Sequence, residues 1–175
     1  FKISRVDTCS IQEGSRRYSR HVPRARRRIQ CSRNASRHHS REHGDSFQAI
    51  AQVYRDLRGE LESHMWKEEM VLFPLIEGLE QAETTGRAAP PSHCGSVRNP
   101  IHVMESEHVN AKHALAELRR LTGGFTPPAG ASADFRNLLT GLAELETDLH
   151  SHIHMEDDML FPRAGELEGR LAHAG

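Results

Sequence analysis

Three stretches of the chain carry apolar residues at every third or fourth position, the spacing of one face of a helix. They cover residues 46–80, residues 99–122 and residues 134–165. In the second stretch, Asn99 suits a helix cap and Pro100 the first helical position. None of the three alternates apolar and polar residues as a half-buried strand does. The pattern therefore predicts an all-α fold.

Amphipathic helices bury their apolar faces against one another, so a fourth helix is expected to complete a bundle. The N-terminal segment, residues 1–44, is the source left for it, but this segment is polar, rich in Arg and Ser, and has no clear apolar stripe. We therefore expect an up-and-down four-helix bundle whose first helix has weak support in the sequence.

An internal repeat is the strongest signal in the sequence. Residues 57–74 and 145–162 match at an offset of 88 positions, with eight identities in 18 positions. Each copy carries a His and a Glu four residues apart, so that the two side chains share a helix face. The identical pairs are Leu57/Leu145, Leu61/Leu149, Ser63/Ser151, His64/His152, Glu68/Glu156, Leu72/Leu160, Phe73/Phe161 and Pro74/Pro162.

The two His-Glu pairs continue the apolar stripes instead of facing solvent. His64 and Glu68 follow Leu57 and Leu61 at helical spacing and precede Leu75. A buried ionisable group must be paired, neutralised or bound to a metal, because burying it bare costs several kcal/mol. The second copy behaves alike, and its stripe reads Leu138, Leu142, Leu145, Leu149, His152, Glu156 and Met159.

A third histidine, His108, lies on the apolar stripe of the middle helix. Two carboxylates and three imidazoles directed into one core are the ligands of a di-metal centre, in which carboxylates bridge the ions. Thiolate-rich zinc sites and all-oxygen calcium or magnesium sites fit this donor set less well than iron or manganese. The alternative is a bundle whose histidines are hydrogen-bonded core residues.

Four sequence segments resemble the hemerythrin-like domain, and in particular the di-iron proteins that repair iron–sulfur clusters (the RIC family). They are His64-Met-Trp-Lys-Glu68-Glu-Met-Val-Leu-Phe-Pro74, Pro100-Ile-His-Val-Met-Glu-Ser-Glu-His108, Leu121-Thr…Phe125-Thr-Pro-Pro128 and His152-Ile-His-Met-Glu156-Asp-Asp-Met-Leu-Phe-Pro-Arg163. The resemblance implies a hemerythrin-like di-iron domain over residues 41–165, after a divergent basic segment over 1–40 and before a tail over 166–175.

The resemblance also implies roles for single residues. His64, His108 and His152 would be terminal iron ligands, and Glu68 and Glu156 would bridge two iron ions that share an oxo or hydroxo bridge. The family has two more ligands near the ends of its first helix. Their counterparts here are His43, in a stretch that resembles the family motif, and His21, whose surroundings do not match.

The function that the resemblance implies is repair of iron–sulfur clusters damaged by nitrosative or oxidative stress, by iron donation or by capture of a diatomic molecule such as nitric oxide or oxygen. The partners would be damaged iron–sulfur proteins. A metal-binding repair role is favoured over a turnover enzyme. Two alternatives stay open: a module that binds or senses oxygen or nitric oxide, and a nitric oxide reductase.

Composition adds little to this interpretation. Basic and acidic residues nearly cancel, 23 against 24, which argues against a nucleic-acid or membrane partner. No apolar run reaches the roughly 20 residues that span a bilayer. The basic N-terminal region lacks the apolar stretch of a secretory signal. Three scattered cysteines without a CxxC motif fit a reducing, cytoplasmic location.

Overall fold

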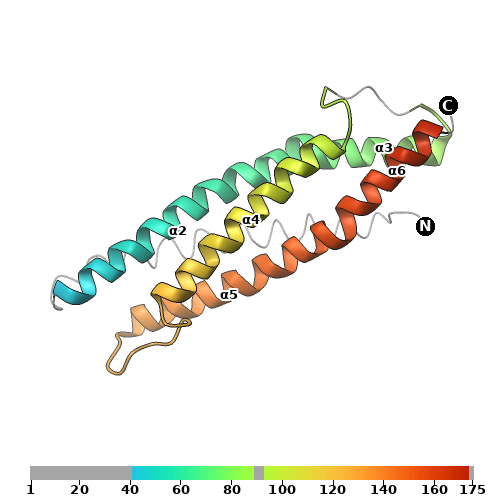
Figure 1. Cartoon of the computed structure of the whole chain (residues 1–175). Helices are drawn as coiled ribbons and strands as arrows, with labels where there is room; N and C mark the ends of the chain where they lie inside the picture. Colours follow the sequence, from blue (N-terminus) through green and yellow to red (C-terminus); the bar gives the residue numbers. More distant parts are fainter. Residues whose placement is uncertain (1–40, 89–92, 174–175) are drawn as a thin grey trace. The chain divides into compact units, whose positions relative to one another are not determined.

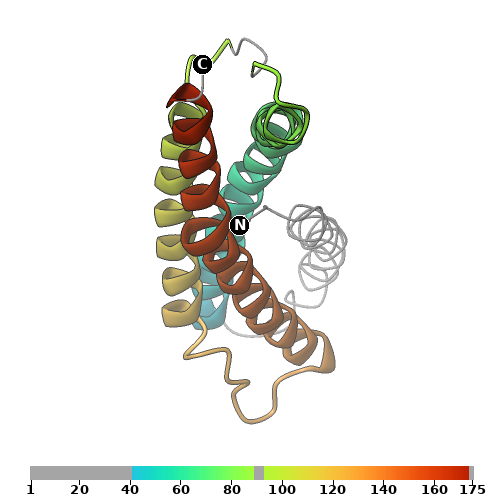
Figure 2. The ribbon, with the colours of Figure 1, turned by 90° about the vertical axis from the view of Figure 1, so that its right-hand side faces the viewer.

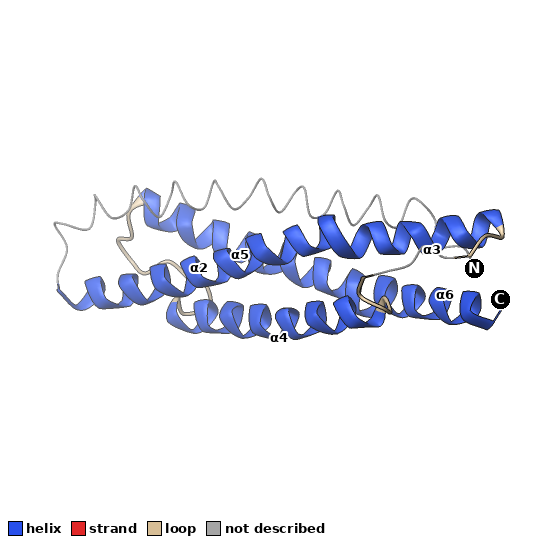
Figure 3. Ribbon diagram, turned by 90° about the horizontal axis from the view of Figure 1, so that it is seen from above, coloured by secondary structure: helices blue, strands red, loops and turns tan. Residues whose placement is uncertain are grey.

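The computed structural model describes residues 41–88 and 93–173, with side chains from Phe47 onward. Every regular element in these residues is helical (Figures 1 and 3), which confirms the predicted all-α class. The expected first helix falls on residues 1–40 and lies outside the described residues. The elements are α2 (Arg41–Lys67), η2 (Glu68–Leu72), α3 (Phe73–Thr85), α4 (Arg98–Leu121), α5 (Ala133–Met155), η3 (Glu156–Leu160) and α6 (Phe161–His173).

Two of the predicted helices are each built from three consecutive elements. The stretch predicted over 46–80 is α2, η2 and α3, and the stretch predicted over 134–165 is α5, η3 and α6. The short elements η2 and η3 are single π-turns. The first stretch ends where Gly86 adopts a left-handed backbone with φ of 65°, a conformation that glycine enters without steric cost. The last helix runs beyond its predicted end to His173.

The described residues belong to two compact units. The first unit takes in Glu62–Val109 and Ser151–Gly175, and the second takes in the part of α2 up to Leu61 together with Asn110–His150. No described helix combines the length and the apolarity that crossing a membrane demands.

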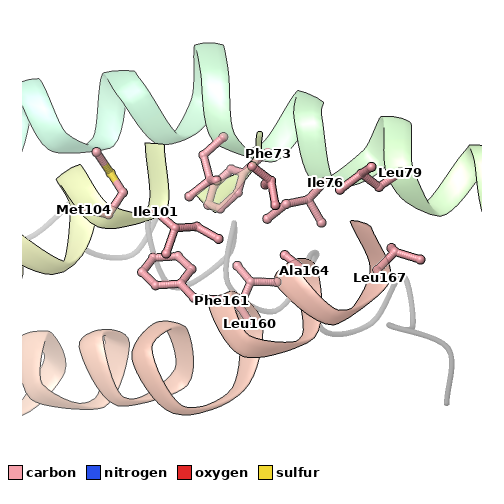
Figure 4. Close-up of a cluster of buried hydrophobic side chains, with 11 residues drawn as sticks. Phe73, Ile76, Leu79, Ile101, Met104, Leu160, Phe161, Ala164 and Leu167 are labelled. Carbon is pink, nitrogen blue, oxygen red and sulfur yellow. The ribbon is translucent and has the colours of Figure 1, made fainter. Parts of the chain in front are cut away.

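The core of the first unit is a cluster of side chains from η2, α3, α4 and the turn before it, η3 and α6 (Figure 4). Phe73 and Ile76 of α3 meet Phe161 and Leu167 of the last stretch, and all four are almost fully buried. Burying one such side chain stabilises the fold by about 1.5–3 kcal/mol. The whole cluster comprises Leu72, Phe73, Ile76, Leu79, Val97, Ile101, Met104, Leu160, Phe161, Ala164 and Leu167.

The start of α4 is fixed by a carboxylate of α6. Glu168 accepts a hydrogen bond from the Val97 amide at 2.7 Å and one from the Ser96 hydroxyl at 2.6 Å. The Ser96 oxygen in turn accepts from the Arg98 amide at 3.1 Å. The helix begins at Arg98, so Asn99 lies inside it and the prediction that Asn99 caps it is wrong. The Asn99 side chain donates instead to the Cys94 carbonyl at 2.7 Å.

The second unit buries the apolar stripe of each of its helical segments. Leu57 of α2, Leu115 of α4 and Leu142 of α5 are each 1% exposed. Arg119 of α4 donates from Nε and Nη2 to the Glu146 carboxylate of α5, at 3.0 and 2.6 Å. The same guanidinium lies 5.2 Å from the centroid of the Phe125 ring. Phe125 belongs to the loop between α4 and α5, and Figure 2 shows the course of this loop.

Candidate metal centre

The repeat places its two His-Glu pairs at equivalent points of two helices of the first unit. His64 lies in the last turn of α2 and His152 in the last turn of α5. Glu68 and Glu156 are the first residues of the π-turns η2 and η3. The histidines are 3% and 7% exposed and both glutamates 0%. The prediction that these polar pairs continue the buried stripes is confirmed.

Each π-turn changes which residues face the core after its glutamate. The amide of Phe73 donates to the carbonyl of Glu68, and the amide of Phe161 donates to that of Glu156, both five residues on. The wider turn inserts an extra residue relative to an α-helix, and such turns are frequent at functional sites. As a result Leu160 and Phe161 are buried, whereas Met159 is 41% exposed. The prediction that Met159 belongs to the buried stripe is wrong.

The side chains of the two pairs converge on one point. Nε2 of His64 lies 3.0 Å from Oε1 of Glu68. Nε2 of His152 lies 3.4 Å from Oε1 of Glu68 and 3.3 Å from Oε1 of Glu156. The four residues each offer one ligand atom within 4.8 Å of the others.

His108 of α4 completes the group that the structure brings together. Its ring is 2% exposed, and its Nε2 lies 3.1 Å from Oε2 of Glu156 and 3.3 Å from Nε2 of His64. The ring stacks on Phe161 with centroids 5.8 Å apart and an interplanar angle of 6°. Three imidazoles and two carboxylates from α2/η2, α4 and α5/η3 thus share one buried site.

Two further carboxylates hold the outer nitrogens of two of these rings. Nδ1 of His64 is 3.0 Å from Oε2 of Glu107, and Nδ1 of His108 is 2.7 Å from Oδ1 of Asp157. Lys67 also contacts the Glu107 carboxylate. A neutral imidazole that donates from Nδ1 presents an Nε2 lone pair. Carboxylates commonly fix the tautomer of a metal-binding histidine in this way.

This donor set fits a cation. If Nδ1 of each ring donates to its carboxylate, the Nε2 atoms of His64 and His108, 3.3 Å apart, both carry lone pairs, and a positive charge between them relieves the repulsion. No oxygen of Glu68 or Glu156 receives a hydrogen bond of good geometry within the described part of the chain. Orphaned buried acceptors of this kind call for an ion or a proton. Mixed imidazole and carboxylate donors suit iron or manganese.

The charges of the two glutamates show the same need. Burial raises the pKa of Glu156 well above its usual range, and the neighbouring charge of Glu68 raises this pKa further. Burial also opposes ionisation of Glu68, but contact with His152 and His64 outweighs it and lowers the Glu68 pKa. Burial lowers the pKa of His152, yet contact with Glu68 and the charge of Glu156 leave this pKa raised. Without a metal, protons balance the site, so a cation would compete with them.

The other predicted ligands are not placed by the structure. His21 lies outside the described residues, and the side chain of His43 lies outside them too, although α2 includes its backbone. Glu107 and Asp157 adjoin the predicted residues His108 and Glu156 but are not among the residues that the sequence pattern predicts. Trp66, which lies between the ligand positions His64 and Glu68, is 60% exposed.

The sequence matches the family described as hemerythrin, with the hemerythrin HHE cation binding domain, over residues 24–164. The chain therefore belongs to the hemerythrin HHE domain family. It is similar to proteins named iron-sulfur cluster repair protein YtfE, with 44% identity over 115 residues in Edwardsiella ictaluri and 39% over 127 residues in Yersinia pseudotuberculosis serotype O:1b. It is 41% identical over 122 residues to the iron-sulfur cluster repair protein DnrN of Neisseria gonorrhoeae.

The matches cover 66%, 71% and 69% of this chain, respectively. They confirm the resemblance to cluster-repair proteins that the motifs indicated. The chain spans 46% and 52% of the lengths of the two YtfE relatives and 69% of the length of DnrN.

Proposed function

We propose that this protein carries a non-haem di-iron centre and acts in the repair of iron–sulfur clusters damaged by nitrosative or oxidative stress. The observation that carries the proposal is the buried convergence of His64, Glu68, His108, His152 and Glu156 on one point. The names of the relatives, all iron–sulfur cluster repair proteins, give the direction of the function.

The residues divide the work of holding the metal. The carboxylates of Glu68 and Glu156 lie at the centre of the group and would bridge two ions, while the Nε2 atoms of the three histidines would be terminal ligands. His43 and His21 are the proposed ligands from the N-terminal side. Bound iron would supply ligand exchange and redox chemistry at the site, and in donation it would be the cargo.

The shell around the site favours release as well as binding. The five proposed ligands that the structure describes include only two anionic groups. Less negative charge therefore neutralises two ferrous ions than in carboxylate-rich di-iron sites. Protons compete for Glu156 and His152, whose pKa values are raised in the metal-free site. A site that exchanges metal for protons suits delivery of iron to a damaged cluster.

The test is a transfer experiment under anaerobic conditions. A [4Fe–4S] protein is damaged with nitric oxide, separated from the reagent and mixed with the iron-loaded full chain, a reductant and a sulfide source. We expect the cluster absorbance of the client to return, and the iron content of the chain to fall in step.

The test variants are Glu68→Gln and Glu156→Gln, which keep the side-chain volume and remove the bridging charge. The matched control is Glu69→Gln, at an exposed neighbouring position. Glu69→Gln should restore the client like the unaltered chain. Failure of the iron-loaded chain to restore any client would contradict a repair role. Binding of nitric oxide without restoration would favour the binding or sensing alternative, and release of nitrous oxide with a reductant would favour the reductase.

A further inference from the structure

Two of the three central histidines each contact, through Nδ1, a carboxylate of a neighbouring helical segment. Glu107 of α4 holds His64 of α2, across 43 positions of sequence. Asp157 of η3 holds His108 of α4, across 49 positions. In both pairs the carboxylate meets Nδ1, the nitrogen on the far side of the ring from the Nε2 atom that faces Glu68 or Glu156.

The geometry restricts each ring to one useful tautomer. A carboxylate within 3.0 Å of Nδ1 favours a proton on that nitrogen, because the two can then form a charge-assisted hydrogen bond. The proton on Nδ1 leaves Nε2 with the lone pair that a metal needs. The ring also cannot rotate without breaking the bond, so its direction is set before metal arrives.

The third histidine lacks this support. Nδ1 of His152 is buried and has no hydrogen-bond partner within residues 47–88 and 93–173. The two supports are therefore specific features of His64 and His108, not a general consequence of burying an imidazole at this site.

We propose that Glu107 and Asp157 are positioning residues of the metal centre, which fix the Nε2 atoms of His64 and His108 toward it and thereby slow the escape of metal. The inference rests on the proposed metal site. Glu107 is itself anchored by Lys67, and its side chain is 27% exposed, so this support reaches from solvent to the centre. Asp157 directly follows the bridging candidate Glu156 and is 26% exposed.

The experiment measures how fast iron leaves the loaded full chain. The chain is loaded with ferrous iron anaerobically, freed of excess metal and mixed with a coloured iron chelator. Second-layer partners of metal-binding histidines typically change metal affinity by about 10–100-fold. We therefore expect Glu107→Ala and Asp157→Ala to release iron at least about 10-fold faster, with Glu107→Gln and Asp157→Asn in between because an amide oxygen still accepts from Nδ1–H.

The chain offers matched controls for both positions. Glu105, on the same helix as Glu107, contacts Nδ1 of the exposed His102 at 3.0 Å. Asp158, next to Asp157, pairs with the exposed His154. Glu105→Ala and Asp158→Ala remove similar His–carboxylate pairs away from the site, and their release rates should stay within about twofold of the unaltered chain. Circular dichroism before loading verifies that each variant is folded.

Lys67→Met separates positioning from simple cross-linking of helices. It breaks the ion pair with Glu107 but leaves the contact between Glu107 and His64. If Glu107 acts only by tying α2 to α4 through Lys67, this variant will release iron as fast as Glu107→Ala, and the proposal is wrong. Unchanged rates in both alanine variants, or equal acceleration by the exposed controls, would also overturn it.

The proposed function and this inference fail differently. If the unaltered chain takes up no iron, the metal centre itself is refuted and the inference with it. If the unaltered chain is loaded and the rates do not follow Glu107 and Asp157, only the positioning role is lost. If an alanine variant does not fold, the iron-release rate of Glu107→Gln or Asp157→Asn decides the test in its place.

Discussion

Glu68 and Glu156 each open a π-turn, and an oxygen of each carboxylate faces the same atom, Nε2 of His152, at 3.4 and 3.3 Å. The repeat in sequence is thus a repeat of backbone geometry around a shared centre. Because both carboxylates are fully buried and only a few ångströms from the same nitrogen, their charges cannot coexist without protons or a cation.

The metal-free site should make the chain less stable as pH rises. Burial and the charge of Glu68 raise the folded-state pKa of Glu156. A carboxyl with a raised pKa stabilises the fold below its ordinary pKa and loses that contribution as pH rises through the raised value. Glu156→Gln imitates the protonated form. We expect chelator-treated Glu156→Gln to melt at a higher temperature than the chelator-treated parent at neutral pH, and to lose the part of the pH dependence that comes from Glu156. The raised pKa of His152, which Glu68 helps to maintain, leaves the variant a smaller pH dependence of the same sign.

Thermal melts of both proteins between pH 5 and 8 measure this effect, with the exposed Glu69→Gln as the control. A parent whose melting temperature is flat over that range, and equal to that of Glu156→Gln, would show that the buried pair is not strained by its charge.

The ion pair between Arg119 and Glu146 in the second unit should act in the opposite sense. Hydrogen bonds from Arg119 lower the pKa of Glu146. A carboxyl with a lowered pKa stabilises the fold above its ordinary pKa, and this contribution is lost as pH falls through the lowered value. Glu146→Gln should therefore lower the melting temperature at pH 7 and leave it nearly unchanged near the acid end of the folded range. Equal losses at both pH values would indicate a packing effect instead of charge.

The aromatic side chains of the first unit should differ sharply in their contribution to stability. Phe73 is 1% exposed in the core of this unit, whereas Trp66 is 60% exposed seven positions earlier. Replacing a buried Phe with Ala leaves a cavity and costs about 3–5 kcal/mol, while exposed substitutions stay within about 0.5 kcal/mol. Denaturant unfolding of Phe73→Ala and Trp66→Ala tests the contrast, and a large loss in Trp66→Ala would contradict its exposed position.

The contact between Glu168 and the start of α4 should stabilise the fold about as much as a helix cap does. The carboxylate accepts from the Val97 amide and the Ser96 hydroxyl, and losing such a cap costs about 0.5–2 kcal/mol. Glu168→Ala should lower the free energy of unfolding by about that amount. The exposed Glu166→Ala, on the same helix, should not. Equal effects of the two substitutions would refute the capping role.

The sequence predicts the positions of the central residues well, because His64, Glu68, His152 and Glu156 fall in register with apolar stripes on two helices. It does not predict the π-turns, because the hydrogen bond from the Phe73 amide to the Glu68 carbonyl has no signature in the spacing of the apolar residues that precede the turn. Met159 was misplaced for that reason. The sequence does not predict the role of Glu107, because its contact with His64 is tertiary: the two residues are 43 positions apart and on different helices.

Single-residue rules were less reliable at the helix ends and on the surface. Asn99 and Pro100 have the form of a helix start, yet the helix begins at Arg98, because Glu168 of another helix accepts hydrogen bonds from Ser96 and Val97 just before it. Trp66 has a large aromatic side chain of the kind that usually packs in a core. It lies instead on the outer face of its turn, two positions from the buried His64 and Glu68.

The most direct test of the metal centre is the iron content of the full chain purified without oxygen and loaded with ferrous iron, measured beside its near-ultraviolet spectrum after mild oxidation. We expect about two irons per chain, as in hemerythrin-like and other di-iron bundles, with charge-transfer absorption that is lost in Glu68→Gln and Glu156→Gln and kept in Glu69→Gln. A single iron would contradict the di-iron proposal, and no iron in any of these proteins would contradict the metal centre itself.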